Sequence, residues 1–98
     1  MSTTTNFIAE LVRAANKIDR LTTVEKYRLL ERAAYTIRDM EAQLGNAIDQ
    51  KAHRIAGELL TLTEMVMDGG YNVLVAQGML EGADAIRRLR ILADKKLN

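Results

Sequence analysis

The stretch from Thr23 to Val66 constrains the fold most, because its apolar residues recur mainly at steps of three and four. Steps of this kind keep the side chains on one face of a helix. The spacing is close to a heptad repeat, so we expect coiled-coil-like packing against other helices rather than against a sheet. The face comprises Val24, Tyr27, Leu30, Ala34, Ile37, Leu44, Ile48, Ala52, Ile55, Leu59, Leu62 and Val66.

Two consecutive steps of four residues interrupt this rhythm beside Gly45. They fit a stutter in one continuous rod, about 70 Å long, or two helices that meet at Gly45–Asn46. We favour two helices, because Gly reaches positive φ without a Cβ clash and is preferred just past a helix end. Asn46 then resembles an N-cap, and Asp49 favours the new N-terminus. The alternative is the rod, with helices exchanged between chains.

Turn and cap signals divide the rest of the chain. Thr22 and Glu25 have the spacing of a capping box. Asp68-Gly69-Gly70 is typical of a turn between helices, after which Asn72 can cap a further helix, as Thr5 or Asn6 can cap the first. The sequence therefore predicts a flexible tail over residues 1–5 and helices over approximately 6–19, 23–44, 47–67 and 72–96.

Composition defines the class of protein. A chain of 98 residues with 48% hydrophobic and 28% charged residues is expected to fold as one domain, residues 1–98. It has no Pro and no alternating polar and apolar stretch, so it predicts an all-α fold. We expect an antiparallel helical bundle of about four helices, a short first helix and three longer ones. There is no membrane-spanning or secretory segment, which predicts a cytoplasmic protein.

Few residues could support catalysis. The chain has no Cys, and His53 is its only His, with Asp49 one turn before it. A solvated His beside a carboxylate explains this pair better than a metal site does. We therefore predict no enzyme, no cofactor and no metal site. The remaining enzymatic alternative is a pocket for a dicarboxylate, which would be lined by Arg13, Lys17, Arg28 and Arg32.

The segment from Leu59 to Leu80 is apolar on more than one helix face, which indicates a central helix or an interface. Gly78 and Gly82 lie one turn apart and form a notch, which close approach of another helix backbone would explain. Together with the small size of the chain, these features predict a homodimer. The predicted interface comprises Met65, Met67, Tyr71, Val75, Gly78, Met79 and Gly82.

The charge distribution provides the second functional hypothesis. The net charge is +1, but the middle of the chain is acidic and its end is basic. Such segments can attract each other within a chain or between chains. Arg87, Arg88 and Arg90 are candidate phosphate contacts, although Asp84 and Asp94 are placed to pair with them. The sequence thus favours a non-enzymatic protein–protein interaction module, an adaptor, regulator or inhibitor. The alternative is a nucleic-acid-associated regulator.

Overall fold

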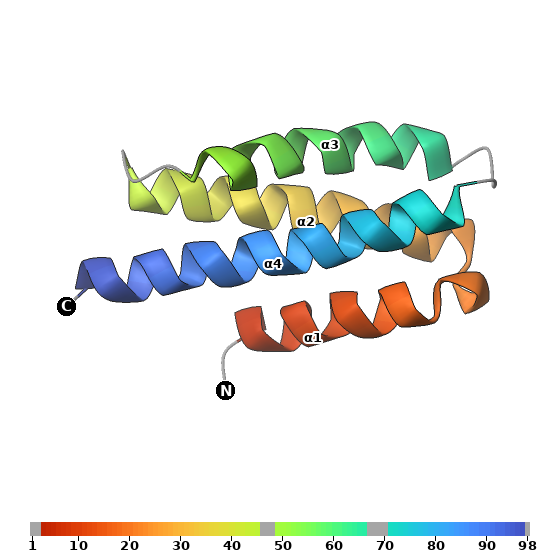
Figure 1. Ribbon diagram of the computed structural model, residues 1–98, viewed down its shortest axis with the longest axis horizontal. Helices are drawn as coiled ribbons and strands as arrows, with labels where there is room; N and C mark the ends of the chain where they lie inside the picture. Colours follow the sequence, from red (N-terminus) through yellow and green to blue (C-terminus); the bar gives the residue numbers. More distant parts are fainter. Residues whose placement is uncertain (1–2, 46–48, 67–70, 98) are drawn as a thin grey trace.

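The protein is an all-α four-helix bundle whose neighbouring helices run antiparallel (Figure 1). A computed structural model describes residues 3–45, 49–66 and 71–97. The order of elements is α1 (Thr3–Asn16), a short 3-10 helix (Ile18–Arg20), α2 (Thr23–Leu44), α3 (Gln50–Val66) and α4 (Asn72–Leu97). None of these helices is both long and apolar enough to cross a membrane.

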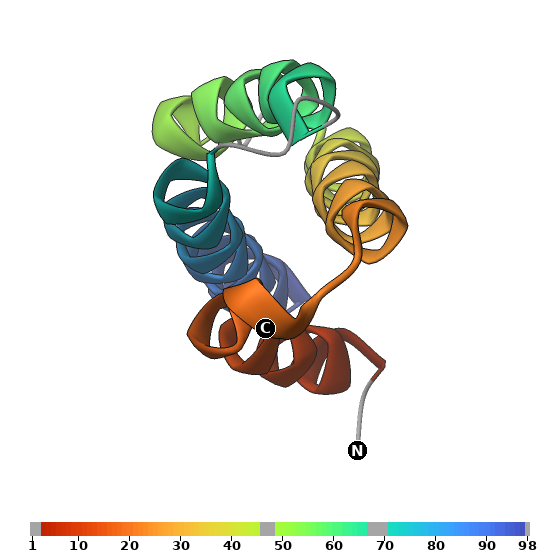
Figure 2. The same cartoon turned by 90° about the vertical axis from the view of Figure 1, so that its right-hand side faces the viewer.

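Helix α4 packs against more helices than α1 does. It contacts each of the other three helices, whereas α1 rests mainly on α4 (Figure 2). The α4 residues that face the core are almost fully inaccessible to solvent, as their apolar spacing predicts. They pack with side chains from every other helix. The largest fully buried side chains of the whole core are Leu11, Leu30, Ile37, Ile55, Leu59, Val75, Met79, Ile86 and Leu89.

The start of α2 confirms the predicted capping box. The backbone N–H of Glu25 donates to the Thr22 hydroxyl at 3.1 Å, and the N–H of Thr22 donates to the Glu25 carboxylate at 2.8 Å. These bonds satisfy two donors that the first turn would otherwise leave unpaired. They also hold the pKa of Glu25 below its usual value, because the N–H and hydroxyl of Thr22 favour the ionised carboxylate.

The predicted break after Leu44 is confirmed, and the continuous rod is wrong. Helix α2 ends at Leu44, and Gly45 follows at φ 67°, where a Cβ would be strained. Asn46 lies outside the described residues. Asp49 is the capping residue of α3, because its carboxylate accepts from the N–H groups of Lys51 and Ala52 at 3.0 and 3.1 Å. Helix α3 begins at Gln50, three residues after the approximate start predicted at residue 47.

The ends of α1 and α4 differ from prediction in detail. Helix α1 begins at Thr3, so residues 3–5 are helical rather than a tail, and a 3-10 turn replaces the predicted last turn. Asn72 is the first residue of α4, and its side chain does not cap the helix. Its carbonyl oxygen accepts from the Lys26 ammonium at 2.7 Å, and its amide donates to Asp19 at 3.1 Å. It ties α4 to α2 and to the 3-10 turn.

The glycine notch of α4 is filled from within the same chain. A Cβ at Gly78 would lie 2.5 Å from Leu62 Cδ1, and one at Gly82 would lie 3.2 Å from Leu59 Cδ1 and 3.5 Å from the Cβ of Ala33. The notch therefore receives α3 leucine side chains and lets α2 approach α4 across the bundle. The occupants are side chains, so the predicted approach of a second helix backbone is corrected.

Candidate interaction surface

One face of α4 points away from the bundle and carries exposed apolar side chains. Its residues follow at steps of four, three, four, three and four, which is the spacing of a heptad seam. The face lies on the side of the helix opposite the buried residues of α4, with which it alternates along the sequence. We call it the outer stripe; it comprises Val73, Gln77, Leu80, Asp84, Arg87 and Ile91.

The three apolar residues of the outer stripe are exposed to solvent. Val73 is 81% exposed, Leu80 43% and Ile91 48%. Isolated exposed apolar residues are ordinary on protein surfaces, but regular spacing along one helix is not explained by the core. The end-on view places α4 at a corner between α3 and α1, so this face is open to the outside (Figure 2).

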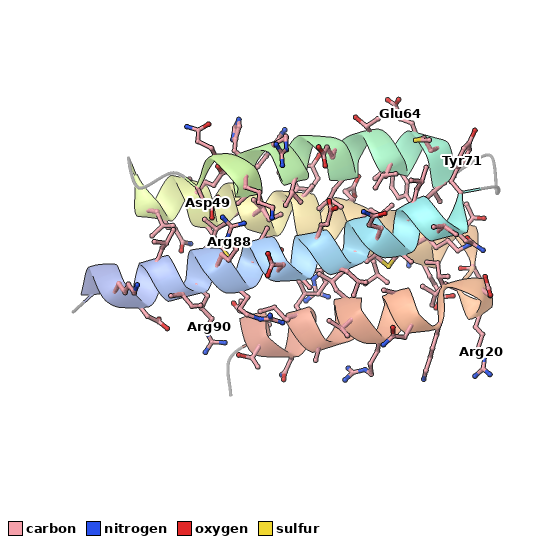
Figure 3. All side chains as sticks on the ribbon, in the orientation of Figure 1. Arg20, Asp49, Glu64, Tyr71, Arg88 and Arg90 are labelled. Atoms are coloured by element: carbon pink, nitrogen blue, oxygen red, sulfur yellow. The ribbon has the colours of Figure 1, made fainter. Side chains whose placement is uncertain are left out.

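The predicted interface residues do not share one surface. Val75 and Met79 are 1% and 0% exposed, and both glycines of the notch are buried. They are core residues of a single chain, so this part of the predicted interface is not accessible to a second one. Tyr71 is exposed at the end of the bundle (Figure 3), Met65 is half-buried, and Met67 lies outside the described residues.

Two grooves of opposite charge flank α4. The groove between α1 and α4 has a volume of about 660 Å³; Ile8, Val12 and Ile91 line it, and its charged residues are Arg13, Arg87, Arg90 and Asp94. The groove between α3 and α4, about 330 Å³, is lined by Leu62 and Leu74, and its charged residues are Glu58 and Glu81. Helix α4 therefore separates a basic groove from an acidic one.

Two of the three arginines predicted to contact phosphate, Arg88 and Arg90, point in different directions (Figure 3). Arg88 turns toward α3, where its guanidinium pairs with Asp49 at 2.6 Å and more distantly with Asp84 at 3.9 Å. Arg90 donates to the Thr5 hydroxyl of α1. Arg87 is exposed on the outer stripe, and no described residue supplies it with an acceptor. The structure thus separates Arg88 from the other two arginines, which both line the groove between α1 and α4.

The predicted pairing of His53 with Asp49 is also corrected. His53 Nδ1 lies 3.1 Å from a Glu41 carboxylate oxygen, while Asp49 is engaged by Arg88. Among the described residues no group of three or more His, Asp or Glu side chains could hold a metal ion.

The arginines proposed to line a dicarboxylate pocket are divided. Arg28 and Arg32 lie between α1 and α2 with Glu10 and Glu25, whereas Arg13 lies in the groove between α1 and α4. Arg32 pairs with Glu10 at 3.5 Å and covers the Phe7 ring at 4.0 Å. Its guanidinium is thus used in joining α2 to α1.

A third apolar hollow lies between α2 and α3 near the end that carries Tyr71. Val24, Tyr27, Thr63 and Glu64 line its volume of about 500 Å³. The Tyr27 hydroxyl donates to Glu31 at 3.0 Å. This bond, with the negative charge of Glu31, raises the pKa of Tyr27.

Sequence reasoning missed the outer stripe because only three of its six residues are apolar. Val73 and Leu80 also share helical spacing with Ala76 and Ala83, so in the sequence they read as part of a broader apolar arc. The signal that identifies the outer stripe is the unbroken heptad spacing together with the central charges Asp84 and Arg87.

Comparison with known proteins supplies no relative. No family model matches the chain, and no curated protein or solved structure matches it significantly.

Proposed function

We propose that this protein is a non-enzymatic helical module for protein–protein interaction, an adaptor, regulator or inhibitor that acts as a homodimer. The observation that carries the proposal is the outer stripe of α4. Three large apolar side chains lie on this face at helical spacing, on the helix that packs extensively against each of the other three. Burying such a face against another helix is a common mode of recognition between proteins.

The chemistry of the surface supports the same function. The core-facing surface of α4 already packs against α1, α2 and α3, whereas the outer stripe leaves much of its apolar area exposed to solvent. Removing Leu80 and Ile91 from water would contribute roughly 25 cal/mol per Å² of apolar area. Flanking grooves of opposite charge would orient a partner and disfavour wrong ones.

The test is the solution mass of the chain by light scattering over a concentration series. A mass that rises from one chain to two with concentration is expected. A single-chain mass throughout the micromolar range would contradict the homodimer, and the outer stripe would then be a surface for a different protein.

The second candidate is the nucleic-acid-associated regulator. The specific observation in its favour is the basic groove, where Arg13 and Arg87 find no acceptor among the described residues. Fluorescence anisotropy with a labelled DNA duplex at low and raised salt distinguishes the two. Binding that weakens steeply with salt, and is lost in Arg13→Ala with Arg87→Ala, would support the nucleic-acid function. We expect no such binding.

A further inference from the structure

We infer that the protein pairs with a second copy of itself through the outer stripe, with the two α4 helices antiparallel. This inference rests on the proposed homodimer and specifies its geometry. The observation behind it is that four of the six residues of the outer stripe form their own complement when reversed. From Leu80 to Ile91 it reads apolar, acidic, basic, apolar.

Antiparallel alignment pairs these residues in layers. With the twofold axis between Ala85 and Ile86, Leu80 faces Ile91 of the partner subunit, and Asp84 faces Arg87 of the partner subunit. The twofold axis repeats both pairs, so the overlap has apolar layers outside and two opposite-charge layers inside. In antiparallel helix pairs a residue at one core position of the heptad faces a residue at the other core position of the partner helix.

The charged side chains are free enough to make these pairs. The Asp84 side chain is 48% exposed, and its only described ion pair is the long contact with Arg88. Arg87 has no acceptor among the described residues.

Parallel pairing lacks this complementarity. Two α4 helices in parallel register would place Asp84 against Asp84 of the partner subunit, and Arg87 against Arg87 of the partner subunit. Like charges in adjacent layers disfavour that register by several kcal/mol. An opposite-charge pair between apolar layers fixes orientation more than it adds affinity. We therefore expect a specific dimer of moderate, micromolar affinity.

Charge reversal gives the sharpest test, read by sedimentation equilibrium or light scattering. Asp84→Arg alone puts two arginines together at both charged layers, and Arg87→Asp alone puts two aspartates together there. Each variant is expected to dimerise at least about 100-fold more weakly than the wild type. An equimolar mixture of the two should restore a dimer, because every charged layer then holds one Arg and one Asp.

The double variant Asp84→Arg with Arg87→Asp provides the rescue, and it should dimerise like the wild type. The substituted residues Asp84 and Arg87 are half-exposed and exposed. Far-UV circular dichroism of the variants should therefore show unchanged helicity. Leu80→Ala should weaken the dimer at least about tenfold without lowering helix propensity. Val24→Ala is the matched control: Val24 is 55% exposed but lies on α2, and its loss should change the affinity less than about twofold.

The outcomes separate this inference from the proposed function. A wild-type dimer that is insensitive to both single reversals would overturn the antiparallel α4 pairing and leave the homodimer standing. Failure of the mixed variants to associate, with each alone monomeric, would overturn it as well. A wild type that is monomeric at every concentration would overturn both the pairing and the homodimer.

Discussion

The glycines of this bundle differ in what surrounds them. Gly78 and Gly82 face packed leucine side chains, whereas a Cβ at Gly57 in α3 would have no atom within 4 Å. Glycine inside a helix costs about 0.5–1 kcal/mol relative to Ala, because the unfolded chain has more freedom to lose. At Gly78 and Gly82 packing offsets this cost, and at Gly57 nothing described does.

Gly57→Ala should therefore stabilise the protein by about 0.5–1 kcal/mol. Urea unfolding followed by circular dichroism gives the change in the free energy of unfolding. Gly82→Ala is the control, since its Cβ would press on the fully buried Leu59 and the gain should shrink or reverse. Equal stabilisation by the two substitutions would contradict this account of the notch.

Residue-scale inference from the sequence succeeded where the partner lies nearby in the chain. The bonds between Thr22 and Glu25 and the helix end at Gly45 depend on local backbone geometry, and both were predicted. The pairing of Asp49 with Arg88 joins residues far apart in the chain, so spacing gave no sign of it. For the same reason Val75 and Met79 were assigned to an interface, although α4 buries them inside the bundle.

Helix α2 depends on its capping box in a way that pH can reveal. The bonds from Thr22 hold the pKa of Glu25 below the ordinary 4.5. A carboxyl whose folded pKa is lowered stabilises the folded state above its unfolded pKa. That contribution disappears as the pH falls through the lowered value.

Glu25→Gln should therefore be less stable than the wild type at neutral pH, and the difference should vanish in acid. Gln resembles the protonated carboxyl in shape, so the comparison isolates the charge. Urea unfolding of both proteins at neutral pH and at a pH well below 4.5 measures the difference. A gap of the same size at both pH values would show that the carboxylate charge does not act through the cap.

At the scale of elements, amphipathic periodicity predicted which segments are helical and which face of α3 is buried. It could not assign the two sides of α4. A helix that packs against three others has core-facing residues over a wide arc, and its outer stripe is left with a mixed composition. The candidate surface therefore emerged only when the positions of α1, α2 and α3 around α4 were known.

The whole molecule is held together unevenly. Helices α2, α3 and α4 contact one another mutually, while α1 joins the bundle mainly through α4, assisted by Arg32 over Phe7 (Figure 2). Regions with fewer packing partners open at lower free energy than the core. We expect α1 to be the least stable of the four helices.

Hydrogen exchange by mass spectrometry tests this with two matched substitutions. Leu11 of α1 and Leu89 of α4 are both 0% exposed, so truncation to Ala at each should cost about 2–5 kcal/mol locally. Leu89→Ala should lower protection in all four helices. Leu11→Ala should lower it chiefly in α1, and an equal loss in α2 and α3 would contradict the uneven architecture.

The contacts of α4 with all three other helices have a consequence for folding during synthesis on the ribosome. Synthesis proceeds from α1 to α4, so the helix that every other helix needs emerges last. Until then the apolar faces of α1, α2 and α3 have no common partner, and α1 lacks its main one. The four-helix core therefore cannot close until α4 has been synthesised, although α2 and α3 can already pack against each other.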